Sequence, residues 1–156
     1  MIKIQIKRNE LKDLFEFANK SFNNHNAQYR EKRKVKKDII IGKLGELAYK
    51  KLFEDKVSEI NYTNNVKGDG GYDFIHAGFK IDVKTNRATY HDNVYFKKLT
   101  FDYIALMQIE NISHNEINII FAGYCDKDTV KKYSNSKNNF FEIKKRYFTN
   151  LIIENE

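Results

Sequence analysis

The spacing of hydrophobic residues changes along the chain from the period of a helix to the period of strands. Residues 38–54 (DIIIGKLGELAYKKLFE) repeat apolar positions every three or four residues, which predicts a helix with Asp38 as its N-cap. A shorter stripe predicts a helix over about residues 10–22 with Asn9 as its cap. The basic segment 23–38 is then either a loop or an exposed start of the second helix.

Strand patterns dominate the rest of the chain. Alternating, β-branched or aromatic runs predict strands over residues 2–6, 58–63, 71–77, 79–85, 103–109, 117–124 and 139–143. Ala77-Gly78 predicts a tight hairpin, and the nearly continuous apolar runs 103–109 and 117–124 predict strands covered on both faces. Residues 86–101 are irregular or contain a short helix, and another short helix is expected near 126–133. These elements predict one α/β domain over residues 1–156, with a mixed central β-sheet flanked by helices.

Two glycines inside the predicted helix indicate where it lies against the sheet. Gly42 and Gly45 each cost about 1 kcal/mol relative to alanine in a helix interior. That cost is tolerable if the helix must lie close to the sheet at this point. Glu46 adjoins the glycines, so its carboxylate is expected near the sheet rather than in water.

The charge of the chain favours a polyanionic partner. The formal net charge is +7, and Lys and Arg side chains that neutralise phosphates release condensed counterions. A solvated basic surface or an acidic membrane surface would account for the same charge. No amphipathic basic helix and no apolar stretch of about 18 residues is present, so no membrane partner is expected.

The N-terminus and the cysteine content bear on the compartment. MIKIQIKRNE alternates apolar and charged residues, unlike a signal peptide, and Cys125 is the single cysteine, which leaves no disulfide frame. The expected location is intracellular and cytoplasmic.

Acidic and basic side chains coincide on the predicted hairpin. In FKIDVKT, strand alternation places Asp82 and Lys84 on one face, roughly 6.6 Å apart along the strand. Asp73 in GDGGYDF joins them if the hairpin at Ala77-Gly78 forms. Two nearby carboxylates repel each other unless they share a proton or a cation, and oxygen ligands favour Mg²⁺ or Mn²⁺. The alternative is that these carboxylates cap a turn or pair with Lys84.

These residues resemble the motifs of the PD-(D/E)-x-K nuclease superfamily, which includes restriction endonucleases. Glu46 in GKLGELAYKKLF, Asp73 in GDGGYDF, and Asp82 with Lys84 in DVKT have the order and spacing of that family. The resemblance covers about residues 38–124 and implies a restriction endonuclease-like core of the order α-β-β-β-α-β. Two features depart from the family pattern: Tyr72 replaces the proline, and the helix between the third and fourth strands is weakly encoded.

The resemblance implies a metal-dependent nuclease, most simply a Mg²⁺-dependent DNA endonuclease in which Mn²⁺ substitutes. Asp73, Asp82 and the backbone carbonyl of Val83 would hold the metal. Glu46 would support a second metal or a metal-bound water, and Lys84 would position the attacking water.

Candidate nucleic-acid contacts flank these residues on both sides in the sequence. They are Arg30, Lys32, Arg33, Lys34, Lys36 and Lys37 in the basic segment, and Thr85, Asn86 and Arg87 after the D-x-K motif. Tyr90 belongs to the second group by position. For both groups an ordinary solvated surface is the alternative, and phosphate contacts alone do not separate DNA from RNA. With one site per chain, a homodimer would allow cuts in both strands of a duplex.

Several alternatives remain open from sequence. One is an RNA or branched-DNA nuclease, another is a catalytically inactive nucleic-acid-binding module on the same fold, and a third is a structural protein held by charge. Asp69 is an alternative ligand but is better explained as a turn residue. His76, His91 and His114 lack the spacing of a zinc site, and the aromatic residues over 95–103 are expected to pack in the core.

Overall fold

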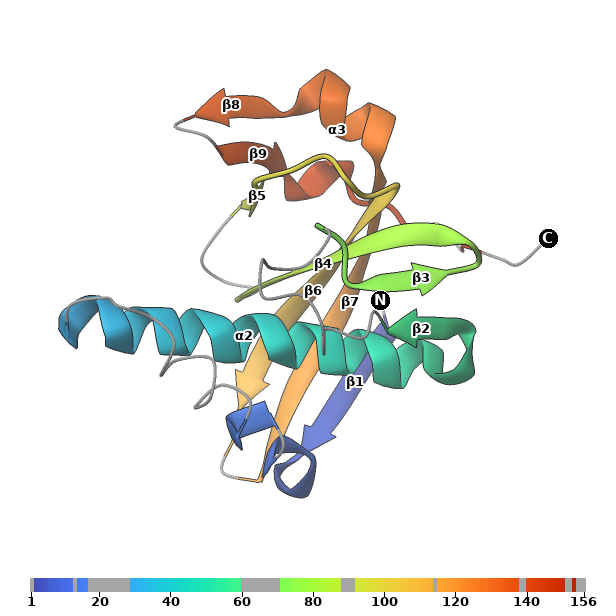
Figure 1. Cartoon of the computed structure of the whole chain (residues 1–156). Coiled ribbons are helices and arrows are strands. Elements are labelled where there is room, and N and C mark those ends of the chain that lie inside the picture. The colour runs from blue at the N-terminus through green and yellow to red at the C-terminus, as the bar shows by residue number, and fades with distance from the viewer. Residues whose placement is uncertain are drawn as a thin grey trace.

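Two β-sheets and one long helix organise the described part of the chain (Figure 1). The computed structural model describes residues 2–12, 14–16, 29–59, 71–87, 92–113, 115–137, 140–150 and 153. Its strands are β1 (Ile2–Lys7), β2 (Val57–Glu59), β3 (Phe74–His76), β4 (Phe79–Arg87), β5 (Asn93–Phe96), β6 (Tyr103–Ile112), β7 (Glu116–Asp126), β8 (Asn135–Lys137) and β9 (Phe140–Lys144). Its helices are α2 (Tyr29–Phe53) and α3 (Lys127–Tyr133), with 3-10 turns η1 (Arg8–Leu11), η2 (Glu54–Lys56) and η4 (Lys145–Tyr147).

The six-stranded central sheet is mixed, as the sequence predicts. Its strand order is β1-β7-β6-β4-β3-β2, in which β4 and β6 run parallel and every other neighbouring pair is antiparallel. β1 lies at one edge of this sheet, in agreement with the prediction for residues 2–6. The tight hairpin at Ala77-Gly78 is confirmed, since both residues have the positive φ angles (51° and 80°) that such a turn needs.

The central strands are buried on both faces, as predicted, but the long helix α2 covers one face and a second sheet covers most of the other. Ala105 and Met107 of β6 pack in a core with Leu44 and Ala48 of α2. Ile104 and Leu106, on the opposite face of β6, pack in a second core together with Val94 of β5, Val130 of α3 and Ile143 of β9. This second face is covered by the small sheet β5-β9-β8 and the short helix α3. The mixed sheet with flanking helices is therefore confirmed in part, since β5, β8 and β9 supply much of the cover on the second face beside the short α3.

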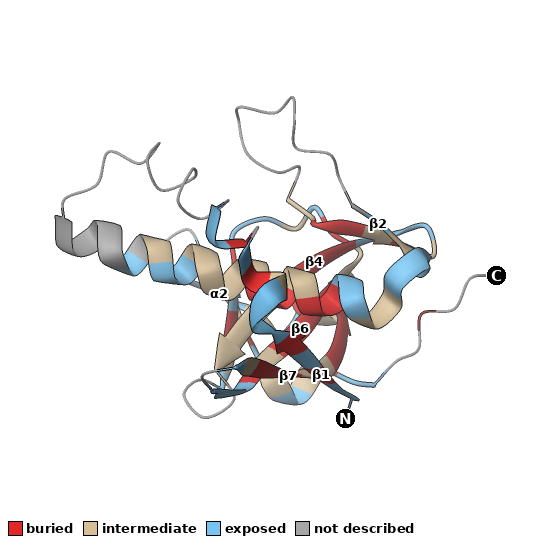
Figure 2. Ribbon diagram, turned by 90° about the horizontal axis from the view of Figure 1, so that it is seen from below, coloured by how far each residue is buried: buried red, intermediate tan, exposed pale blue. Residues whose placement is uncertain are grey.

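Helix α2 begins nearer the N-terminus than its apolar stripe predicts. It starts at Tyr29, so Asp38 is an interior residue and not an N-cap. Residues 29–37 contain Lys, Arg and Glu and no Gly or Pro, so their helix propensity extends the helix without an apolar face. In Figure 2, the buried residues of α2 lie in the part of the helix that crosses the sheet.

The remaining elements add three corrections. Asn9 lies inside η1 and caps no helix, because the turn begins one residue earlier, at Arg8, and Glu10 accepts a hydrogen bond from the Lys7 amide at 2.7 Å. The segment predicted as irregular contains β5, which pairs with β9. β8 was likewise not predicted. Parts of the predicted helix over 10–22 and of the predicted strand over 58–63 lie outside the described residues.

The helices of the structure bear on the question of membrane spanning. Among the described residues, no helix is both long and apolar enough to cross a membrane.

Candidate active site

The β3–β4 hairpin positions Asp73 at the edge of β4. Pairing of Phe74 with Ile81 sets the register, and the Asp73 amide donates to the Ile81 carbonyl at 2.8 Å. The Asp73 carboxylate Oδ2 accepts a hydrogen bond from the Val83 amide at 2.7 Å. Asp73 is buried. Its carboxylate therefore occupies the position beside β4 where β3 pairing ends.

Strand alternation in β4 places Asp82 and Lys84 together, as predicted. Ile81 and Val83 pack in the core beneath α2, and the side chains of Asp82 and Lys84 point to the other face. Lys84 Nζ lies 2.6 Å from Asp82 Oδ1. The Val83 carbonyl lies on the same side of the strand as its amide, because both groups of one residue project in the same direction. It therefore faces the edge where Asp73 sits.

Close contact between α2 and β4 positions Glu46. A Cβ on Gly45 would lie 2.9 Å from the Thr85 Cβ and closer still to the Thr85 hydroxyl, so only glycine fits here. The Gly42 carbonyl faces Thr85 Oγ1 at 3.5 Å, yet a Cβ on Gly42 would meet nothing within 4 Å. Helix docking therefore depends on Gly45 as predicted, and Gly42 is needed less.

The pKa of Glu46 indicates which charged groups lie near its carboxylate. Burial, together with the nearby Asp73 carboxylate, raises the pKa of Glu46 to about 7, although Lys43 and Lys84 act in the opposite direction. Lys43 also forms an ion pair with Glu46 one turn away on the helix. Glu46, Asp73 and Lys84 therefore act on one another electrostatically, although they come from three separate elements.

This arrangement collects more acid than base. Three carboxylates (Glu46, Asp73, Asp82) share two ammonium groups (Lys43, Lys84), so the cluster carries a negative charge when every group is ionised. Within the described part of the chain, no three His, Cys, Asp or Glu side chains lie together so that they could hold a metal ion. Mg²⁺ typically uses one or two carboxylates and fills its other positions with water and substrate oxygens. The donor set fits an open site of that kind.

A groove of about 690 Å³ opens beside Lys84. Lys34 and Lys37 of α2 line one wall, and Thr85, Asn86 and Arg87 continue from Lys84 along β4; the remaining lining residues are Asp38, Ile41, Asn93, Val94, Tyr95 and Leu106. The fold thus brings the two groups of candidate nucleic-acid contacts together around one groove.

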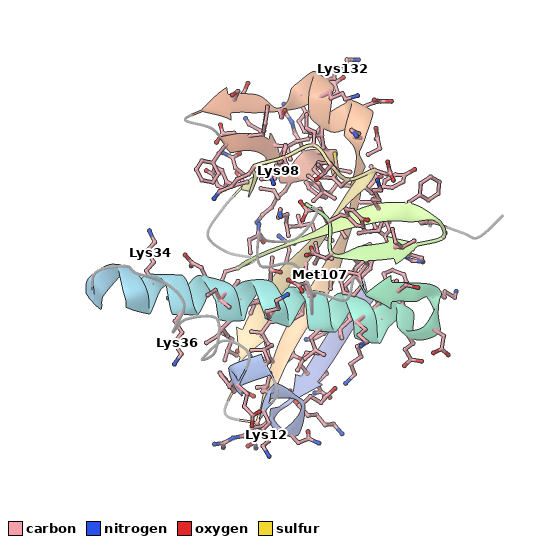
Figure 3. All side chains as sticks on the ribbon, viewed as in Figure 1. Lys12, Lys34, Lys36, Lys98, Met107 and Lys132 are labelled. Atoms are coloured by element: carbon pink, nitrogen blue, oxygen red, sulfur yellow. The ribbon has the colours of Figure 1, made fainter. Side chains whose placement is uncertain are left out.

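The six basic candidates on α2 do not all belong to the groove. Figure 3 shows Lys34 and Lys36 on opposite sides of α2, and Lys36 is not among the groove residues. Arg30, Lys32 and Arg33 lie on α2, but their side chains are outside the described set. Tyr90, His91, His114 and Asp69 also lie outside it.

Sequence reasoning missed three residues that the structure places at or beside the site. Lys43 pairs with Glu46 at i,i+3, a helical spacing visible in the sequence. Asn93 and Tyr95 of β5 line the groove, but their strand pairs with a segment about 50 residues away, so no local pattern indicates them.

A second polar cluster lies beneath α2. Tyr49 Oη lies 2.8 Å from His76 Nδ1 and 2.8 Å from Tyr124 Oη, and all three residues are buried. Burial lowers the pKa of His76 and raises that of both tyrosines, which keeps the three groups neutral. His76 is therefore a satisfied core residue, consistent with its lack of zinc spacing.

Comparison with known proteins adds no template for this site. No family model, no curated protein and no solved structure matches the chain.

Proposed function

We propose that this chain is a metal-dependent nuclease that hydrolyses phosphodiester bonds, most simply a DNA endonuclease. One observation carries the proposal. Asp73 and Lys84 both influence the charge of Glu46, Lys84 pairs with Asp82, and Lys84 lines a basic groove. An acidic cluster beside a basic groove suits a polyanion whose phosphate is attacked at the cluster.

The order of elements supports a restriction endonuclease-like core. α2, β2, β3 and β4 follow one another, and β6 then lies parallel to β4. This order agrees with the α-β-β-β-α-β arrangement of the PD-(D/E)-x-K resemblance, except between β4 and β6. There the described residues contain β5 in place of a helix.

The residues that would hold Mg²⁺ are Asp73, Asp82 and the Val83 carbonyl, with Glu46 supporting a second ion or a bound water. When bound, the cation would lower the pKa of water and stabilise the developing charge of the transition state. Mn²⁺ has similar ligand preferences and would substitute.

Lys84, the Val83 amide and Glu46 would have the remaining roles in the reaction. Lys84 Nζ, whose ammonium group lies against Asp82, would donate hydrogen bonds beside the phosphate and orient the attacking water. The Val83 amide locks the Asp73 carboxylate in one orientation, which reduces the reorganisation needed during reaction. Glu46, with a pKa of about 7, accepts a proton near neutral pH.

The groove supplies substrate binding. Lys34, Lys37 and Arg87 would contact phosphates without reading sequence. The positive potential along α2 would be extended by Arg30, Lys32, Arg33 and Lys36. A homodimer would place two sites on one duplex. The protein is proposed to act on intracellular DNA in the cytoplasm.

A substrate panel tests the proposal. Supercoiled plasmid, linear duplex, single-stranded DNA, a four-way junction and RNA are incubated with Mg²⁺, Mn²⁺ or EDTA, using the wild type and Asp82→Ala. Cleavage that requires metal and is lost in Asp82→Ala supports the nuclease. Binding without cleavage in every metal would instead support the catalytically inactive module, and cleavage of RNA or junctions alone would redirect the substrate class.

A further inference from the structure

The small sheet β5-β9-β8 presents an outer face that combines exposed aromatic rings with basic side chains. Val94, Phe96 and Ile143 point into the second core, so their neighbours along each strand point outward. Among these, Tyr95 is 51% exposed and Phe140 is 42% exposed. Apolar rings left in water on one sheet face are a recognised feature of binding surfaces.

Positive charge is concentrated in the same part of the chain. Residues 127–150 contain seven Lys and Arg against two Asp and Glu, which accounts for five of the seven net charges of the whole protein. Lys137 pairs across the strands with Phe140, and Lys97 Nζ lies 5.1 Å above the Phe140 ring. Figure 3 shows Lys98 and Lys132 on this side of the molecule as well. Charge and exposed rings thus share one surface.

This surface is continuous with the groove of the candidate active site. Tyr95 lines the groove, and Asn93 lines both the groove and a smaller hollow of about 210 Å³ on the outer face. The hollow includes Lys144, Arg146 and a pair of stacked rings, Tyr133 and Tyr147, whose centroids are 4.5 Å apart. A chain of ligand contacts can therefore run from Lys84 to α3 without crossing the core.

Two hydrogen-bond donors at the groove lack a protein partner. Asn86 Nδ2 and Arg87 Nε are buried, and neither has a hydrogen-bond partner within the described structure. Both residues line the groove directly after Lys84. Buried donors without partners are costly and rare in folded proteins, so a ligand acceptor that reached these two atoms would relieve that cost.

We propose that the outer face of the β5-β9-β8 sheet binds an unpaired nucleic-acid strand and leads it into the groove, where Asn86 and Arg87 donate to its phosphate or base oxygens. Exposed rings stack on the faces of bases, and those faces are accessible only when the strand is not in a duplex. The basic side chains follow the backbone. The inference rests on the proposed nuclease function only for the destination of the strand at Lys84.

Binding measured in EDTA tests the surface separately from cleavage. Fluorescence anisotropy is recorded with labelled oligo-dT, oligo-rU of the same length and a blunt duplex, using the full chain. We expect single strands to bind more tightly than the duplex, and the tighter of the two single strands identifies DNA or RNA. Tyr95→Ala and Phe140→Ala should each weaken single-strand binding by roughly 5- to 100-fold. Tyr95→Trp, which keeps a stacking ring, should bind like the wild type.

Phe15→Ala is the matched control, because Phe15 is a ring of similar exposure (45%) next to Leu14, which packs in the first core and not in the core of the small sheet. The proposal is overturned if the duplex binds as tightly as the single strands. It is also overturned if Tyr95→Ala and Phe140→Ala bind like the wild type, or if Phe15→Ala weakens binding equally. Intact single-strand binding without cleavage in Mg²⁺ would count against the nuclease function and leave this surface standing.

Discussion

Two buried polar clusters lie beneath the same stretch of α2, and they differ in charge and in access to the groove. Glu46 and Tyr49, three residues apart on the helix, contribute one side chain to each. The cluster around Glu46 holds an excess of carboxylate and adjoins the groove through Lys84. The cluster of Tyr49, His76 and Tyr124 is neutral, closed and internally hydrogen-bonded.

The difference shows which kind of buried polarity indicates a function. Hydroxyl and imidazole groups that satisfy one another add specificity to a core and need no ligand. Carboxylates held close together are unfavourable unless a cation or a proton joins them, so a carboxylate pair such as Glu46 and Asp73 beside a groove is a candidate functional site. Burial of polar groups alone does not distinguish the two clusters.

The largest expected effect is the loss of cleavage activity when the charged cluster is changed at Lys84. Lys84→Ala should reduce metal-dependent cleavage by roughly 100-fold or more, because it removes the ammonium group beside the attacked phosphate. Far-UV circular dichroism should show an unchanged fold, since Lys84 is part-exposed. Purified Lys84→Ala with turnover like the wild type would remove the charged cluster from catalysis.

Next in size is the effect of moving the helix that both clusters share. Gly45→Ala forces a Cβ into Thr85, so α2 must shift, and we expect a loss of about 3 kcal/mol in the free energy of unfolding together with reduced cleavage. Gly42→Ala is the control in the same helix, where the new Cβ meets open space. It should gain up to about 1 kcal/mol from helix propensity. Denaturant unfolding of the two variants measures the contrast, and equal stabilities would show that α2 does not dock through Gly45.

Glu46 should give the free energy of unfolding a pH dependence that a Glu46→Gln variant lacks. The folded-state pKa of Glu46, about 7, lies above its unfolded value of 4.5, so the native state binds the extra proton between these values. Its contribution to stability is full below pH 4.5, falls as the pH rises, and is lost above pH 7. In EDTA the wild type should lose up to about 3 kcal/mol across this window relative to Glu46→Gln. Parallel pH profiles for the two proteins, measured by urea unfolding, would contradict the raised pKa.

The smallest effect should come from the neutral cluster. Tyr49→Phe leaves His76 Nδ1 and Tyr124 Oη with one partner fewer, at a cost of about 1–2 kcal/mol in stability. Cleavage by the folded variant should equal that of the wild type below its melting temperature. A loss of activity larger than the loss of folded protein would assign Tyr49 a part in the site.

Local pattern predicted much of the candidate site. Alternation placed Asp82 and Lys84 on one face, Ala77-Gly78 marked the hairpin that aligns Asp73, and glycine beside Glu46 indicated helix docking. These features depend on a few adjacent residues. The apolar pattern did not predict the early start of α2, because residues 29–37 carry no apolar stripe, although their helix propensity allowed a helix there.

The sequence by itself determined which side chains share a strand face and where the chain turns, because both follow from the periods of neighbouring residues. Only the tertiary structure decided that β3 begins at Phe74, which leaves Asp73 outside the strand and beside β4. It also decided that β5 pairs with β9 to complete the groove. Pairing partners distant in sequence are selected by the packing of whole faces, which no local window contains. The motifs indicated the residues of the candidate site, and strand pairing between distant segments determined what surrounds them.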